Sequence, residues 1–439
     1  MWNFLRKFVV AAALLAAPGG TLYAETVLDI ERAVETAIQN NLALSRTRIE
    51  TGVKERAAAR SWNALYPTLS AGAQTSRGVS LTGDMLPRED WSKALSFSAS
   101  LTIQPAIFAN MTKLKADYEA GLLSYEAAKQ ELELNVRKAF CQILLLKANL
   151  ELSEQTAATA EAGYEQTVAL ARVGQASALD ELSARVNWEN LKPELKTAEA
   201  NYLNALESFK QTLSISGEDV VLSGSLGDMA GGTAMPGGGL PLQTTPQSSL
   251  PRNEPFAIAA LRQSDASLKA QRDTLWMQSY LPTLGLSWNG NPALTDGVWA
   301  DTSGSFTVSL RLGLDPFFPA STAKTQLAAL DDNRRIAAIQ LEEAEAARNS
   351  RIAQLERSVE TSAGSLKTLS LNVELAQQNY DMTTEAYRRG AADLQKLRNA
   401  ADSLSQAGFR LQSERYNLIA AILDLEKELN VPFGSLPYP

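Results

Sequence analysis

Apolar and polar positions along the chain follow two different periods, one of three to four residues and one of two. From Val27 to about Ala64, apolar residues recur every three or four positions, which is typical of a helix with one buried face. Asp29 stands where an N-cap would begin this helix. The Tyr66-Pro67 pair predicts its end, because the residue before a proline is pushed out of the helical region.

Beyond Pro67 the period becomes two, and apolar residues alternate with small or polar ones over 69–76 and again over 95–104. This pattern fits a half-buried strand of a soluble sheet. It also fits a membrane strand about ten residues long, apolar toward lipid and polar toward a lumen. No charged residue lies between Ala94 and Gln104, which favours the membrane interpretation. Pro105 closes the pair.

The longest uniform stretch runs from Phe108 to Leu213 and predicts a helical hairpin. It carries no glycine between Leu122 and Ala162, and the helical pattern is interrupted near Gly174 and resumes at about Ala178. At about 1.5 Å per residue, the first helix would be on the order of 100 Å long. A helix of this length must lie along other helices, in a bundle or a cylinder.

The same order of elements occurs twice. Residues 217–255 are rich in glycine and proline and predict a linker. After it come a helical pattern over 256–280, alternating segments at 284–289 and 306–314, a long helical run over 320–388 broken at Gly390, and a return helix over 394–429. We therefore predict repeats at 25–216 and 256–430 and a short tail at 431–439.

Five landmarks support this duplication, because each lies 211 to 216 residues from its counterpart in the second half. The pairs are Pro67 and Pro282, Pro105 and Pro316, Tyr164 and Tyr380, Gly174 and Gly390, and Tyr202 and Tyr416. Each half reads helix, strand, loop, strand, very long helix, turn, helix.

The N-terminus predicts a secretory signal peptide over residues 1–24, with a membrane anchor as the alternative. Arg6 and Lys7 precede a short apolar run, and Ala24 ends a plausible cleavage site. Glu25 follows instead of cysteine, so no lipid anchor is expected. No later segment holds eighteen continuous apolar residues. An exported chain of this kind is secreted, periplasmic or an outer-membrane barrel.

Composition excludes several kinds of chemistry. The chain has no histidine and a single cysteine, Cys141, which rules out disulfide frameworks, Cys/His zinc sites, Ser-His-Asp triads and Cys-His dyads. A formal charge of −8 argues against nucleic acid as the main partner. No acidic cluster stands out for metal or glycosidase chemistry. We expect neither an enzyme nor a cofactor.

Four strands with a lipid side and a lumen side cannot close a barrel alone, and open edges in lipid leave backbone groups unpaired. Oligomerisation is therefore implied, and three copies would supply twelve strands. The same copies would set helical columns around one axis. The predicted fold is mainly α with a small β part, in which long antiparallel hairpins form an α-barrel continued by a transmembrane β-barrel.

Over essentially its whole mature length the chain resembles the TolC-like outer-membrane efflux proteins. The resemblance rests on the duplicated unit, on the strand starts Tyr66-Pro67-Thr68-Leu69 and Leu281-Pro282-Thr283-Leu284, and on two hairpin tips. The first tip, Gly174 to Arg185, is similar to the family's pattern of glycine, spacer, aspartate, aliphatic residue and Ala-Arg. The second comprises Tyr387-Arg388-Arg389-Gly390 followed by Asp393, Leu394 and Leu397.

The resemblance implies a homotrimer with a barrel in the outer membrane and a helical tunnel in the periplasm. It also implies an adaptor and an inner-membrane transporter of the RND or ABC type as partners. Gly174 and Gly390 would mark the tips where adaptors dock. The candidate gate or constriction residues are Asp180, Tyr387, Arg388, Arg389, Lys396 and Arg398.

Each gate candidate also has a plainer interpretation. Asp180 could be a surface or capping acid, Tyr387 could simply pack between helices, and the basic residues could form a solvated face. The family's acidic pair beyond the second tip falls near Lys396 and Arg398 here, so we expect a basic tip in place of a carboxylate ring. Trp91 and Trp299, in the loops between strands, are candidates for an interfacial aromatic belt or for loop packing.

These expectations describe a passive exit duct of a tripartite efflux or type I secretion system, opened by adaptor binding at the tips. A periplasmic adaptor is one alternative, although adaptors carry a single hairpin. A structural coiled-coil envelope protein is another, although it leaves the charge-free strands unexplained. The sequence does not specify the cargo.

Overall fold

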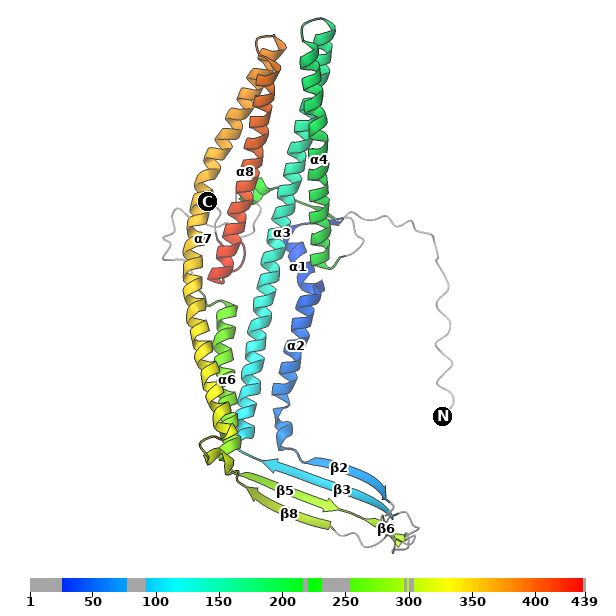
Figure 1. The fold of residues 1–439 in the computed structure, drawn as a ribbon, viewed down its shortest axis with the longest axis vertical. Helices are drawn as coiled ribbons and strands as arrows, with labels where there is room; N and C mark the ends of the chain where they lie inside the picture. The colour runs from blue at the N-terminus through cyan, green and yellow to red at the C-terminus, as the bar shows by residue number, and fades with distance from the viewer. Residues whose placement is uncertain are drawn as a thin grey trace.

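The computed structural model describes residues 26–76, 92–215, 220–230, 253–295, 298–299 and 304–436. Long helices run side by side along the molecule, with two hairpin tips at one end and a sheet at the other (Figure 1). The signal peptide predicted over 1–24 lies outside the described residues.

The two repeats share the order of their main elements, namely helix, two strands, very long helix and shorter helix. The first contains α1 (Ile30–Asn40), α2 (Leu42–Ala59), the short 3-10 helix η1 (Ser61–Leu65), β2 (Thr68–Ser76), β3 (Ser92–Ile103), α3 (Ala106–Arg172) and α4 (Ala178–Leu213). The second contains α6 (Phe256–Tyr280), β5 (Thr283–Gly290), β8 (Gly304–Arg311), η4 (Asp315–Phe317), α7 (Thr322–Arg388) and α8 (Leu394–Leu429). Helices α3 and α7 both have 67 residues, and α4 and α8 both have 36, which agrees with the predicted duplication.

Some elements differ from the sequence-based expectations. Within 217–255, where no helix or strand was expected, lie β4 (Val220–Leu222) and α5 (Leu226–Ala230), and β4 pairs in parallel with β1 (Thr26–Leu28). Three-residue strands are too short to show a period. The first helical region is two helices, because Asn41 ends α1 and caps α2 through its side chain, which accepts the Leu44 N–H. Strand β8 ends at Arg311, short of the expected residue 314.

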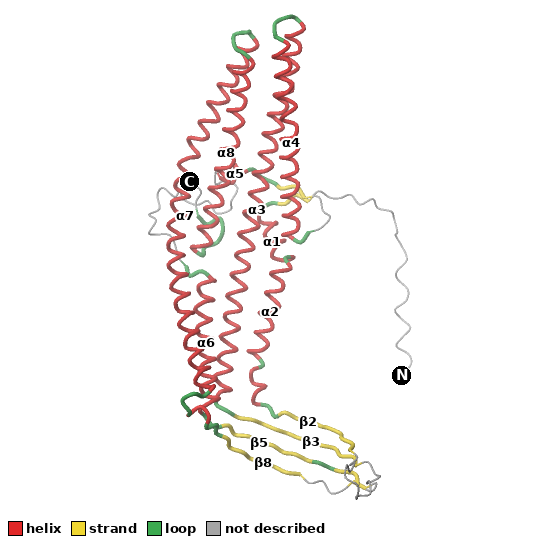
Figure 2. Tube along the Cα trace, viewed as in Figure 1, coloured by secondary structure: helices red, strands yellow, loops and turns green. Residues whose placement is uncertain are grey.

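Among the described residues the four long strands form an antiparallel sheet in the order β2–β3–β5–β8 (Figure 2). Past the end of β5, the short β6 (Ala293–Thr295) pairs with β3, and β7 (Val298–Trp299) pairs with β6. Residues directly opposite one another share a face. Leu101 stands opposite Leu286, which stands opposite Val308, and these lie on an apolar face. Ser70 and Ser98 stand opposite each other on the other face, with their hydroxyl oxygens 2.6 Å apart.

The helices follow the same lateral order as the strands. Near the sheet, α2 packs on α3, α3 on α6 and α6 on α7. Toward the tips, α4 packs on α3, α3 on α8 and α8 on α7. Each repeat therefore contributes one edge: β2, α2 and α4 on one side, β8 and α7 on the other. No helix in the described ranges combines the length and the apolar character needed to cross a membrane.

The main apolar core lies at mid-height, where β1, α1, β4 and the segment after α8 pack against the long helices. Phe140 of α3 and Phe209 of α4 meet edge to face there, and α1, β4 and α8 complete the cluster. Arg137, 4% exposed, pairs with Glu31 and Glu133 and lies over the ring of Phe433. This ion-pair cluster fastens α1 and the C-terminal segment onto α3.

Candidate functional site: the hairpin tips

Both hairpin tips turn through the same backbone motif. Gly174 has φ +75° and Gly390 has φ +73°, a left-handed conformation that glycine adopts without strain. The N–H of Gln175 bonds to the carbonyl of Leu170 at 2.9 Å. The N–H of Ala391 donates to the carbonyl of Ala386 at 2.8 Å. This six-to-one bond after a left-handed glycine is the Schellman ending of a helix, so the two glycines fix the two turns.

The return helices begin on different caps. Ser177 and Asp180 form a reciprocal capping box: the Asp180 N–H donates to Ser177 Oγ at 3.1 Å, and the Ser177 N–H donates to Asp180 Oδ2 at 3.0 Å. Hydrogen bonds from the Ser177 side chain and backbone lower the pKa of Asp180, which keeps it charged. At the second tip Asp393 caps α8 by accepting the Lys396 N–H at 2.8 Å. Asp180 thus has a structural role whether or not it gates.

Tyr387 links the two hairpins. It is 8% exposed, and its hydroxyl lies 3.0 Å from Oγ1 of Thr167, a fully buried residue of α3. The Thr167 hydroxyl donates its single proton to the Gly163 carbonyl at 2.8 Å, so the phenol is the donor to Thr167. A buried hydrogen bond therefore joins the last turn of α7 to the last turns of α3.

Three of the four basic gate candidates have a carboxylate close by on the same chain segment. Arg389 pairs with Glu385 at 2.7 Å, Lys396 with Asp393 at 3.9 Å and Arg398 with Asp402 at 3.9 Å. All of these pairs are at least partly solvent-exposed, so they add little stability. They do offset much of the positive field that the sequence suggested for this tip.

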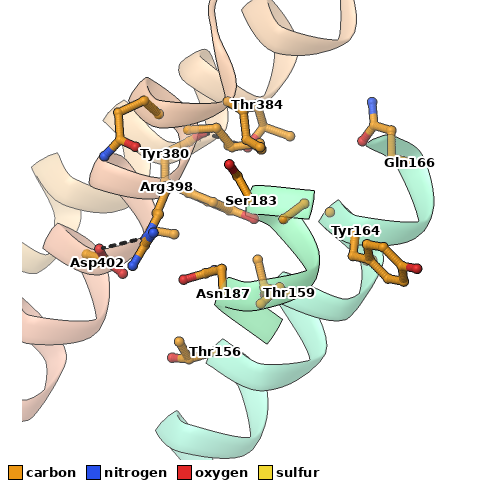
Figure 3. A pocket seen from close by; sticks show the side chains of 18 of the residues that line it. Thr156, Thr159, Tyr164, Gln166, Ser183, Asn187, Tyr380, Thr384, Arg398 and Asp402 are labelled. Atoms are coloured by element: carbon orange, nitrogen blue, oxygen red, sulfur yellow. Dashed lines mark hydrogen bonds and ion pairs between the residues drawn. The ribbon is translucent and has the colours of Figure 1, made fainter. Parts of the chain in front are cut away.

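A cavity of about 520 Å³ lies between the two hairpins, just short of the tips, and is lined by α3, α4, α7 and α8. Figure 3 shows Ser183 and Asn187 of α4 facing Tyr380 and Arg398 of the other hairpin across it. Of the gate candidates, Asp180, Arg388 and Arg398 line this cavity. Tyr387, Arg389 and Lys396 do not appear in its lining, so the structure brings only half of the candidates together there.

The sequence interpretation missed most of the cavity lining. Tyr164 and Tyr380 both contribute to it, and they form a landmark pair of the duplication. That pairing was the one signal in the sequence that could have located the cavity, since these equivalent positions of the two repeats face the same groove. The other missed residues are mostly alanines and short polar side chains, which carry no distinctive pattern. The polar ones include Thr156, Thr159, Gln166, Ser183, Asn187 and Thr384.

The chemistry of this region favours recognition. In the described part of the chain, no group of three or more His, Cys, Asp or Glu residues is arranged to hold a metal ion. The groove instead combines alanine and leucine with amides, hydroxyls and charges of both signs. Such a mixed lining suits a protein surface more than a small reactant.

The two tryptophan candidates remain predictions. Trp91 lies outside the described residues. Trp299 is in β7, where it pairs with Leu294, and only its backbone is described. Neither position tests an interfacial belt.

Comparison with known proteins gives one family and a consistent fold. Residues 33–214 match the family model described as "Outer membrane efflux protein". No curated protein sequence matches the chain. Among solved structures, the Campylobacter jejuni CmeC outer membrane channel superposes with a TM-score of 0.75 at 15% identity, over 93% of this chain and 86% of that one.

Two further solved structures agree. CusC gives a TM-score of 0.74 at 14% identity, over 94% of this chain and 96% of that one. The open state of the Neisseria gonorrhoeae MtrE outer membrane channel gives a TM-score of 0.71 at 16% identity, over 93% of this chain and 89% of that one. At such identities the likeness concerns the fold. The predicted fold class, mainly helical with a small sheet and an internal duplication, is confirmed.

Proposed function

We propose that this chain is a TolC-like outer membrane efflux protein and the outer-membrane channel of a tripartite efflux system, on the basis of the family match over residues 33–214 and of the fold. The observation that carries the proposal is the sheet: one face is apolar, the other is lined with hydroxyls, and helices of 67 residues extend from it. Energy would come from an inner-membrane transporter, of the RND or ABC type, reached through a periplasmic adaptor. The chain itself would be a passive duct.

The two open edges support assembly as a homotrimer. Strands β2 and β8 each have one unpaired side within the described sheet. Unpaired backbone groups in hydrocarbon cost several kcal/mol each, so the edges must pair with other copies. Pairing β8 of one copy with β2 of the next closes a barrel, and three copies give twelve strands.

The helices on the two edges carry exposed apolar residues that suit the same closure. On α2, Leu42, Ile49 and Val53 are 77%, 66% and 54% exposed. On α7, Ile336 and Ile339 are 52% and 56% exposed. Since α2 accompanies β2 and α7 accompanies β8, the contact that closes the sheet also covers both apolar patches.

The tips are the proposed site of recognition and gating. The groove between the hairpins would receive the adaptor, and Gly174 and Gly390 would hold the turns that border it. The Tyr387–Thr167 bond holds the hairpins together. Separating them at the tips breaks this bond, so it favours the closed arrangement that an adaptor would open.

Location and processing follow from the same proposal. Residues 1–24 would be a cleaved signal peptide, Glu25 would begin an unlipidated mature chain, and the outer-membrane lipid would surround the sheet. Residues 25–216 and 256–430 would be the two repeats, joined by 217–255 and followed by the tail 431–439. We also expect no enzymatic activity, because the matched family model describes an outer membrane efflux protein and a similar solved structure is an outer membrane channel.

Membrane extraction and bilayer recording test the duct. The mature protein should require detergent, run as a trimer in light scattering, and form discrete conducting steps in a planar bilayer. A soluble monomer would contradict the proposal and favour the adaptor or the structural coiled-coil alternative.

The gate has its own test in the same recordings. Tyr387→Phe removes one hydrogen bond worth about 1 kcal/mol, so the open-to-closed ratio should rise about fivefold per protomer. Tyr380→Phe, two turns earlier on the same helix, is the matched control and should leave gating unchanged. Equal effects from both variants, or none from either, would place the gate elsewhere.

A further inference from the structure

The hydroxyl-lined face of the sheet is nearly free of charge. By the strand register, its members are small or polar and alternate with the apolar set along each strand. They are Thr68, Ser70, Gly72, Gln74 and Ser76 on β2, Ser92, Ala94, Ser96, Ser98, Ser100 and Thr102 on β3, Thr283, Gly285, Ser287 and Asn289 on β5, and Ser305, Thr307, Ser309 and Arg311 on β8. Arg311 is the exception in both charge and length.

The position of Arg311 lets its charge act on the space beside the sheet. It is the last residue of β8, at the end of the strand next to the helices, and it is exposed. Thr283 stands directly opposite it, and Ser309 and Gly285 are its neighbours on the same face. These short residues cannot cover a guanidinium, which therefore projects beyond the layer of hydroxyls.

Arg311 takes part in none of the ion pairs found within the described residues, where the nearest paired arginines in sequence are Arg272 and Arg334. Asp315, four residues later in η4, is the nearest acid along the chain and makes no ion pair with it. The basic residues of the second tip differ, because Arg389, Lys396 and Arg398 have acids beside them. An arginine keeps its charge at any physiological pH.

The other charged residue of the four long strands serves as a contrast. Lys93 lies near the opposite end of β3 and, by alternation, on the apolar face with Leu95. It is the second residue of β3 and stands between Thr75 of β2 and Leu294 of β6, at the end of the sheet away from the helices. Its charge thus has no access to the hydroxyl-lined space.

We propose that Arg311 forms a cationic ring where the barrel joins the helical tunnel, and that this ring makes the duct favour anionic solutes at that level. The inference rests on the proposed trimer, in which the hydroxyl face becomes the lumen and the three copies of Arg311 share one height. Rings of arginine or lysine select for anions, because fixed charges beside a low-dielectric wall concentrate the field in the opening. The selectivity element is then in the barrel and not at the tips.

Reversal potentials in a KCl gradient measure this preference directly. The chloride-to-potassium permeability ratio should fall several-fold in Arg311→Gln and fall further, toward cation preference, in Arg311→Glu. Lys93→Gln removes the same charge from the other face and end of the sheet, and it should leave the ratio unchanged.

Thiol labelling gives a second readout that does not depend on the tips being open. Cys141 is 1% exposed, and burial raises its pKa to about 12, so the native thiol stays inert. In trimers carrying Ser309→Cys, an anionic methanethiosulfonate should react faster than a cationic one. Adding Arg311→Gln should reduce that rate ratio by on the order of tenfold.

The outcomes separate the two proposals. If no trimer or no conducting step is obtained, the duct itself is contradicted. If trimers conduct but neither the permeability ratio nor the labelling ratio changes with Arg311, the duct stands and the cationic ring is wrong. A Lys93→Gln effect equal to that of Arg311→Gln would also overturn the ring, since it would point to net charge alone.

Discussion

At the scale of single residues, Glu426 is the most unusual side chain. It is fully buried in α8, and its Oε1 accepts the N–H of Leu436 at 2.9 Å, while Oε2 has no hydrogen-bond partner in the described structure. Burial raises the pKa of Glu426 to about 7. The backbone N–H groups of Leu436, Gly434 and Ser435 and the charge of Arg137 favour the carboxylate and offset part of this rise. The C-terminal segment thus closes over a carboxyl group that titrates near neutrality.

This predicts a pH dependence of stability with a definite sign. The folded pKa exceeds the ordinary glutamate value of 4.5, so the contribution of Glu426 to stability is fully present below about pH 4.5 and is lost as the pH rises through about 7. Glu426→Gln should remove this slope, an effect on the order of 2 to 3 kcal/mol between pH 5 and pH 8. Urea unfolding of the detergent-solubilised protein at both pH values measures it.

Glu343→Gln, on the exposed side of α7, is the control and should keep the wild-type slope. A Glu426→Gln protein whose stability still falls between pH 5 and pH 8 as in wild type would show that Glu426 stays ionised or that the segment opens without it.

At the scale of elements, the same glycine-to-alanine substitution should have opposite effects at the hairpin tips and inside a helix. Gly174→Ala and Gly390→Ala each force a left-handed residue and should weaken their tips by about 1 kcal/mol. Gly364→Ala, inside α7 with open space where its Cβ would go, should instead stabilise by about 0.5 to 1 kcal/mol. Hydrogen exchange at the tip amides measures the first effect, and exchange along α7 the second.

The contrast between the tip variants and Gly364→Ala tests whether the turns require a left-handed residue. If all three glycine variants slow exchange alike, the turns do not require the left-handed conformation. If the tip variants also lower the melting temperature of the whole trimer, the tips are less independent of the long helices than their local bonding indicates.

At the scale of the whole molecule, adjacent residues of β8 should respond oppositely to a new charge. Val308 lies on the apolar face and Thr307 on the hydroxyl face. In the proposed membrane-inserted trimer, Val308→Lys should destabilise the assembly by roughly 2 to 4 kcal/mol, because lysine would then face hydrocarbon near mid-depth. Thr307→Lys places the same charge in the lumen and should be tolerated. Heat dissociation of trimers from lipid vesicles compares the two.

Equal tolerance of both lysines would contradict the assignment of the two faces and favour a soluble sheet. A severe loss of trimer stability in both lysine variants would indicate that the hydroxyl face is packed against protein in the trimer. Either result bears on the arrangement of three chains and leaves the monomer fold unchanged.

The sequence by itself determined the elements, because helix and strand impose different spacings on apolar residues. The long hairpins, the alternating strands, the glycine turns and the duplication follow from local periods of 3.6 and 2 and from landmarks repeated along the chain. Asp29 caps α1 as expected, for the same local reason. Sequence also indicated which face of each strand is apolar.

Only the tertiary structure decided which distant residues meet. Tyr387 and Thr167 are 220 positions apart. Strand β1, at the start of the first repeat, pairs with β4, which lies just after that repeat. Glu426 is buried because the C-terminal segment folds back over α8. A period along one element reports which face is buried and not what buries it. The groove between the hairpins and the exposure of Arg311 depend on packing between elements, which no local spacing records.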